Sequence, residues 1–261
     1  MKTSITGPYI GCTGFTMPDE VYDALLMYPI DHSHKLMVGI EVTWKSLRGI
    51  PLKPMWAKQT PEPEAIKSLM IDDERVINLA HYSIGGGQES TILYDMLHIQ
   101  RLAGENFHGF QFNMPWPDID QLRLYRKNVG WEQRIVLQLG KKAIEQAGDT
   151  PQGVIDMLYP YIGVVDDVLF DLSGGHGKPL EAERAFKFLS AIAKEYHLGL
   201  GVAGGLGPYS LGTVEPLIKR FKNNLGIDLS IDAQRELRDE EYNMVGRRVS
   251  VYLTEAPKLF V

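Results

Sequence analysis

Short runs of apolar residues alternate along the chain with segments in which apolar residues recur at helical spacing. Eight of these runs have the length of a buried strand, and glycine-, proline- or polar-rich sequence separates them. The predicted strands are Tyr9–Cys12, Leu36–Val42, Val76–His81, His108–Asn113, Arg134–Leu139, Gly163–Leu172, Gly199–Ala203 and Gly226–Ile231.

Helical patterns lie between these strands. Pro18, followed by Asp19 and Glu20, is a typical helix start. The predicted helices are Pro18–Met27, Pro61–Met70, a segment from the Gly85–Gly87 triplet to Ala103, Asp118–Lys127, Lys141–Tyr159 with a break near Gly148–Pro151, Leu180–Tyr196 and Glu240–Leu253. Strands alternating with helices indicate right-handed βαβ units and a parallel sheet. Eight units favour closure into a (β/α)8 TIM barrel over a doubly wound open sheet. A Rossmann fold also lacks its G-x-G-x-x-G signature after the first strand.

Composition agrees with this architecture and narrows the class of protein. The 261 residues are close to the size of one such barrel, so we expect a single domain over residues 1–261. A net charge of −6 argues against a general nucleic-acid binder. The longest apolar runs are too short to cross a membrane, and the N-terminus lacks the apolar segment of a signal peptide. The single cysteine, Cys12, excludes an internal disulfide, which fits a cytoplasmic protein.

The stretch Val168–Pro179, V-L-F-D-L-S-G-G-H-G-K-P, is the strongest sign of a functional site. Its apolar run ends in one carboxylate, Asp171, and a loop with three glycines follows. Chemistry in a barrel takes place where the strands end, and glycines allow backbone N–H groups to approach a ligand. A second stretch of this kind is Leu198–Leu206, L-G-L-G-V-A-G-G-L.

Polar residues at the other strand ends add further candidates. They are Cys12, Arg48, His81, Gln111, Asn113, Gln138, Gly204, Gly205, Asp228 and Asp232. Each has a structural alternative, such as an inert buried thiol for Cys12 or a surface position for Arg48. The D-H-S-H run at Asp31–His34 precedes the second strand, on the stability face of a barrel. We therefore expect no metal there and no cofactor elsewhere.

Six short motifs occur in the order known from one barrel family. They are G-C-T-G at Gly11–Gly14, S-L-R at Ser46–Arg48, Q-F-N at Gln111–Asn113, an aspartate with a glycine loop at Asp171–Lys178, V-A-G-G-L at Val202–Leu206 and R-D at Arg238–Asp239. In this order they resemble phosphoribosylanthranilate isomerase, the barrel enzyme of tryptophan biosynthesis, over nearly the whole chain.

The resemblance implies an acid–base, Amadori-type rearrangement of an N-linked sugar. A general acid opens the furanose ring, and a general base then removes the proton from C2′. By resemblance, Asp171 at its dry strand end is the acid, Cys12 is the base, and Arg48 holds the aminobenzoate carboxylate. The expected substrate-binding residues are Arg48, His81, Gln111, Asn113, Gly174, Gly175, His176, Gly204, Gly205, Asp228 and Asp232.

Two departures from the family pattern leave alternatives open. Thr13 stands between Cys12 and Gly14, so an ungapped alignment puts Thr13 at the base position, and only a one-residue bulge would restore Cys12. The eighth strand carries Asp232 where the family has the glycine of a phosphate-binding S-S-G, and this carboxylate would repel a phosphate.

These departures leave two alternative functions open. One is a hydrolase or lyase that acts on a nucleoside-like or glycosylamine substrate without phosphate, and the other is a non-catalytic ligand-binding barrel. In each case the expected partner is a small sugar-linked molecule, with or without phosphate, and neither a nucleic acid nor a membrane. The oligomeric state stays open between monomer and homodimer.

Overall fold

The computed structural model of the protein describes residues 7–260. Within this range eight parallel strands pair in chain order, and β8 pairs with β1 to close a barrel. The strands are β1 Tyr9–Thr13, β2 Lys35–Thr43, β3 Val76–Ser83, β4 Gly109–Phe112, β5 Arg134–Gly140, β6 Asp167–Asp171, β7 Gly199–Ala203 and β8 Ser230–Ala233. The predicted (β/α)8 barrel is confirmed.

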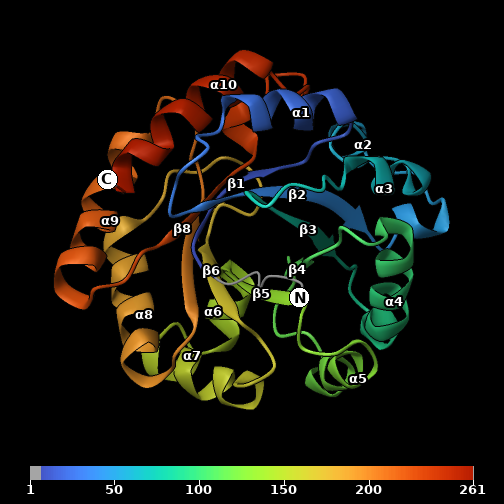
Figure 1. Ribbon diagram of the computed structural model, residues 1–261. Coiled ribbons are helices and arrows are strands. Elements are labelled where there is room, and N and C mark those ends of the chain that lie inside the picture. The colour runs from blue at the N-terminus through green and yellow to red at the C-terminus, as the bar shows by residue number, and fades with distance from the viewer. Residues whose placement is uncertain (1–6, 261) are drawn as a thin grey trace.

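Helices surround the strands on the outside of the barrel (Figure 1). They are α1 Pro18–Met27, α2 Pro54–Ala57, α3 Ile66–Leu69, α4 Ile92–Ala103, α5 Ile119–Val129, α6 Lys141–Gln146, α7 Pro151–Leu158, α8 Ala182–Glu195, α9 Leu211–Leu225 and α10 Gly246–Glu255. Sequence signals mark several starts. Asp118 caps α5 by accepting from the N–H groups of Asp120 and Gln121, and the Thr150 hydroxyl accepts from the N–H of Gly153 at the start of α7.

The last strand differs most from its prediction. Helix α9 ends at Leu225, and Gly226 caps it in the left-handed conformation with φ +68°. The strand therefore begins at Ser230 instead of Gly226, so Asp228 precedes β8 and Asp232 lies within it. As a result, Asp228 lies at the N-terminal end of the barrel and Asp232 lies toward its C-terminal end.

Two other elements are shorter than expected. The sixth strand begins at Asp167 instead of Gly163, because Gly163 adopts φ +77° in the preceding turn. The last helix begins at Gly246 instead of Glu240, because an antiparallel bridge between Arg238 and Met244 holds residues 238–245 in a turn.

Side chains inside the barrel form layers. Alternate residues of each strand point inward, as expected for a pleated sheet. The apolar inner cluster consists of Tyr9, Met37, Ile77, Leu79, Val136, Leu169 and Ala203. A much larger apolar core lies between the strands and the helices. The apolar inner layer separates the polar groups at the two ends of the barrel.

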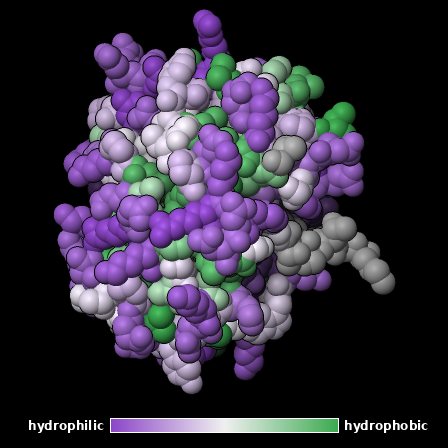
Figure 2. Space-filling view, turned by 90° about the vertical axis from the view of Figure 1, so that its left-hand side faces the viewer, coloured by the Kyte–Doolittle hydropathy of each residue, from purple (hydrophilic) through white to green (hydrophobic). Residues whose placement is uncertain are grey.

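The outer surface is mainly polar. Figure 2 shows one face covered largely by hydrophilic residues, with small apolar patches between them. Helices that are both long enough and apolar enough to cross a membrane are absent from residues 7–260.

Candidate active site

Polar side chains from several strands meet inside the C-terminal end of the barrel. His81, Gln111, Asp171 and Asp232 come from β3, β4, β6 and β8, and all four are buried. They line a small cavity of about 30 Å³, which we call the barrel mouth. Two carboxylates, one imidazole and one amide thus face one small, dry volume at the end of the fold where barrel enzymes carry out chemistry.

Asp171 is held in a fixed orientation at the end of β6. Gln138 Nε2 donates to its Oδ2 at 2.8 Å, and the backbone N–H of Ser173 donates to its Oδ1 at 2.8 Å. The residue is only 8% exposed. A buried carboxyl group that touches the cavity and keeps its geometry is suited to proton transfer.

Asp232 is the second carboxyl group of the mouth. Thr13 Oγ1 donates to its Oδ1 and Oδ2 at 3.0 and 3.1 Å, and Gln111 Nε2 donates to Oδ2 at 3.0 Å. Burial raises the pKa of Asp232 to about 6. The hydrogen bonds from Gln111 and Thr13 and the charge of His81 oppose the rise, and the negative charge of Asp171 adds to it. A carboxyl group that titrates near neutrality can both accept and release a proton at physiological pH.

Several buried polar atoms at the mouth lack a hydrogen-bond partner among residues 7–260. They are both ring nitrogens of His81 and the Oε1 atoms of Gln111 and Gln138. The nearest charged group to the imidazole is Glu41, whose Oε1 lies 3.7 Å from His81 Nε2. Unpaired buried polar groups are costly, and they concentrate where a ligand supplies the missing partner.

Two loops cover the mouth. Gly204 and Gly205 follow β7 with φ +110° and +59°, and the loop after β6 lies against them. The carbonyl oxygens of Gly177 and Lys178 lie 3.1 and 2.9 Å from the position that a Cβ of residue 205 would take. Glycine is therefore required at position 205 by its backbone angle and by this close approach.

Cys12 lies outside this site, which corrects its expected inward placement. Strand β1 pairs with β2 without interruption from Tyr9 to Thr13, so no bulge turns Cys12 inward. Its side chain is fully buried in the outer core, where burial raises the pKa of the thiol well above its usual value. Thr13 takes the inward position of β1 and reaches Asp232.

Arg48 also lies away from the mouth, because a carboxylate of the protein already binds it. Its guanidinium donates to both oxygens of Asp95 on α4, at 2.8 and 3.2 Å, and lies over the ring of Trp44. Asp95 accepts a further bond from Tyr82 Oη at 2.7 Å. This arrangement ties the loop after β2 to α4.

The other predicted residues divide between the mouth and the surface. Gly175, Gly204 and Gly205 line the cavity together with His81, Gln111, Asp171 and Asp232. Asn113, Gly174 and His176 are exposed and outside the lining, which corrects their expected placement. Asp228 is at the opposite end of the barrel, where it pairs with Lys222 at 2.9 Å, because it precedes β8.

The structure adds Glu41 and Gln234 to the groups around the mouth. Gln234 Nε2 donates to Glu41 Oε1 at 2.6 Å. The signal for Glu41 was present, because a single carboxylate interrupts the apolar run Leu36–Val42. The sequence offers no comparable signal for Gln234, since the predicted eighth strand ends at Ile231.

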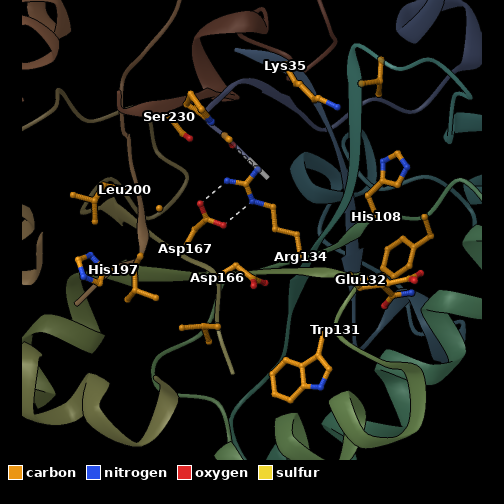
Figure 3. A pocket seen from close by; sticks show the side chains of 18 of the residues that line it. Lys35, His108, Trp131, Glu132, Arg134, Asp166, Asp167, His197, Leu200 and Ser230 are labelled. Atoms are coloured by element: carbon orange, nitrogen blue, oxygen red, sulfur yellow. Dashed lines mark hydrogen bonds and ion pairs between the residues drawn. The ribbon is translucent and has the colours of Figure 1, made fainter. Parts of the chain in front are cut away.

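A larger cavity, about 1060 Å³, lies at the other end of the barrel (Figure 3). A buried ion pair dominates it: Arg134 Nε donates to Asp167 Oδ2 at 2.6 Å, and a second bond joins the same two groups. The N-terminal end of a barrel stabilises the fold, whereas active sites lie at the C-terminal end. We therefore assign the smaller cavity, the barrel mouth, as the candidate active site.

Fold and site together define a (β/α)8 barrel with acid–base groups at the C-terminal ends of its strands. Among residues 7–260, groups of three or more His, Cys, Asp or Glu side chains placed to hold a metal ion are absent. No family model matches the sequence, and no curated protein matches it.

Solved structures of the same fold do match. Phosphoribosylanthranilate isomerase from Thermus thermophilus has a TM-score of 0.61 and 12% identity, with 96% of this chain and 99% of that chain covered. The isomerase from Thermotoga maritima gives 0.61 and 14%, with 96% and 99% covered. Orotidine 5′-monophosphate decarboxylase from Methanocaldococcus jannaschii gives 0.52 and 10%, with 97% and 98% covered. The chain is thus a strongly divergent barrel, similar in structure to the isomerase that its motifs resemble.

Proposed function

We propose that this protein is an enzyme that rearranges a small N-linked sugar by proton transfer, with Asp171 and Asp232 as its acid and base. The observation that carries the proposal is that both carboxyl groups line one cavity at the C-terminal end of the barrel. Two carboxylates in one dry site repel each other and favour a state with one proton between them. Such a pair holds one acid and one base at the same pH.

The geometry suggests a role for each group. In the tautomer of the pair that has the shared proton on Asp171, this residue protonates the ring oxygen of the sugar, which opens the ring to a Schiff base. Asp232 then removes the proton from C2 to give the enolamine. After exchange with solvent Asp232 returns a proton to C1 while Asp171 takes up the enol O–H proton, which completes the aminoketose and restores both groups. Proton transfer by positioned side chains of this kind contributes about 10²–10⁴-fold to a rate.

In this proposal Asp232 takes the role of the base that the resemblance assigns to β1. Thr13 cannot act as a base at neutral pH, but its hydroxyl donates to both oxygens of Asp232. A carboxylate from β8 therefore occupies the space beside the inward position of β1. In this proposal Thr13 positions the base, and Cys12 takes no part in the chemistry.

The similar barrels support a catalytic role over simple ligand binding. The matching structures carry the names of an isomerase and a decarboxylase, and both are enzymes. The unpartnered polar atoms of His81 and Gln111, which line the mouth, support the binding of a polar molecule there.

Cleavage of the C–N bond is a second candidate, and one observation favours it. Asp232 points into the mouth, as expected if it activates water or binds a sugar hydroxyl in a substrate without phosphate. The same two carboxyl groups would then release the amine and leave the free sugar.

Isotope exchange separates these outcomes. The protein is incubated in D2O with N-butyl and N-(2-carboxyphenyl) ribosylamines, each with and without a 5-phosphate, and the products are followed by NMR against a protein-free control. Rearrangement places deuterium at C1 of an aminoketose, whereas cleavage releases the amine without it. If every substrate behaves as in the control, the proposed function is wrong.

A further inference from the structure

Three carboxylates at inward strand positions make the mouth and its immediate surroundings electronegative. Asp171 and Asp232 line the cavity, and Glu41 on β2 lies directly beside His81. Among the cavity-lining residues within 7–260, the basic side chains are His81 and Arg235. His81 already faces the carboxylate of Glu41, so Arg235 is the other basic group at the cavity to consider as a partner for an anion.

The guanidinium of Arg235 is already bound elsewhere. Its Nη1 donates to the carbonyl oxygens of Arg238 and Asp239 at 3.2 and 3.0 Å. The guanidinium carbon also lies 4.6 Å from the ring centre of Tyr242. The part of Arg235 nearest the loop after β6 is the aliphatic stem, whose Cγ lies 2.9 Å from the position of a Cβ on Gly177. Arg235 contributes apolar surface there, and its charge satisfies backbone carbonyls.

The glycine turn after β7, Gly204–Gly205, lies next to oxygen atoms of the protein. Backbone N–H groups in such a turn can cradle an anion when they are open. Here the carbonyl oxygens of Gly177 and Lys178 lie against Gly205. The carboxylate of Glu236 lies against the loop after β6 as well. Its Oε1 atom is 2.7 Å from the position that a Cβ on Gly177 would take. The loop after β6 and Glu236 therefore bring acceptor oxygens close to this turn.

The unpartnered polar atoms indicate which hydrogen-bonding groups a ligand must supply. Gln111 and Gln138 each donate through Nε2 to a carboxylate, and this leaves their buried Oε1 atoms without a donor. A carbonyl oxygen of this kind is satisfied only by an O–H or N–H group. Together with the carboxylates, these atoms require a ligand that is rich in hydrogen-bond donors.

From this geometry we infer that the substrate carries no anionic group and is an unphosphorylated sugar whose nitrogen is a basic amine. A hydroxyl group satisfies the amide oxygen of Gln111, and the positive charge that forms on the nitrogen when the ring opens to the protonated Schiff base is stabilised by the carboxylates around it. The inference rests on the proposed function for the assignment of the mouth as the substrate site. It deepens that function by naming the charge and the donor groups of the substrate.

Three matched probes test the inference by calorimetry at pH 7: ribitol, 1-amino-1-deoxyribitol and ribitol 5-phosphate. We expect the amine to bind at least tenfold more tightly than ribitol, and the phosphate not to bind detectably. Glu41→Gln removes one negative charge with little change of shape, so it should reduce the preference for the amine several-fold. Asp228→Asn removes a charge at the far end of the barrel and should leave the preference unchanged.

The inference is overturned if ribitol 5-phosphate binds as tightly as the amine, or if the amine and ribitol bind equally well. Its failure can be told apart from that of the proposed function. Deuterium transfer that occurs only with 5-phosphorylated substrates would sustain the function and reject the inference. Tight binding of the amine without deuterium transfer or amine release from any substrate would sustain the inference and reject the function.

Discussion

Replacement of Asp171 by asparagine is expected to lower the rate of deuterium incorporation by about 10²–10⁴-fold at saturating substrate. Asparagine keeps the shape of the side chain but cannot deliver the proton that opens the ring. The fold should tolerate the change, because Gln138 can rotate its amide and accept from the new Nδ2 through its unpartnered Oε1. Thermal unfolding and circular dichroism measured on the same sample check that the variant is folded.

Asp228→Asn is the matched control for this variant. Both substitutions remove one carboxylate at or near the end of a strand, but Asp228 is exposed at the opposite end of the barrel and pairs with Lys222. The control should retain the activity of the wild type. Asp171 would lose its assignment as the acid if Asp171→Asn kept more than a tenth of the wild-type rate.

Replacement of Arg134 by methionine is expected to cost about 3–5 kcal/mol of unfolding free energy, the typical loss when one partner of a buried ion pair is removed. Arg134 and Asp167 are each about 95% buried and hold each other through two hydrogen bonds. Burial raises the pKa of Asp167 even with the guanidinium beside it. Without Arg134, the buried carboxylate has lost the charge that compensates it. Urea unfolding at pH 8 measures the loss.

Two further variants show whether the loss comes from the unpaired charge. In Arg134→Met combined with Asp167→Leu both charges are gone, so most of the stability should return. Lys219→Met breaks an exposed pair with Glu215 and should cost about 1 kcal/mol or less. A cost below about 1 kcal/mol for Arg134→Met alone would show that the pair at the N-terminal end of the barrel does not hold the fold together.

Most of the fold could be predicted because each strand carries its own local signal. Runs such as Leu36–Ile40 are apolar throughout, since parallel strands in a barrel are buried on both faces. The eighth strand was placed four residues too early. Its apolar pattern is weak, and the left-handed cap at Gly226, which ends α9, looks in sequence like the start of a strand.

Site residues could be predicted where their position along a strand determines whether they reach the mouth. They could not be predicted where the direction of the side chain determines this. Asp171 ends a clear apolar run, and its place at the mouth followed from that. Cys12 and Thr13 are neighbours that point to opposite sides of the sheet, so a shift of one residue exchanges inside for outside. The partner of Arg48 depends on Asp95, a residue of α4 far along the chain. Such long-range pairs leave no trace in local sequence.

The central claim is that Asp171 and Asp232 form one interacting acid–base pair. Carbon-13 NMR titration of aspartate-labelled protein tests this claim most directly, with Asp232→Asn used to assign the signal of Asp232. Burial and the charge of Asp171 both raise the pKa of Asp232, so the wild type should titrate at about 6. In Asp171→Asn the repelling charge is gone, and the pKa should fall. If Asp232 titrates at the same pH in both proteins, or already near its usual value of 3.8 in the wild type, the two carboxyl groups do not act as a pair.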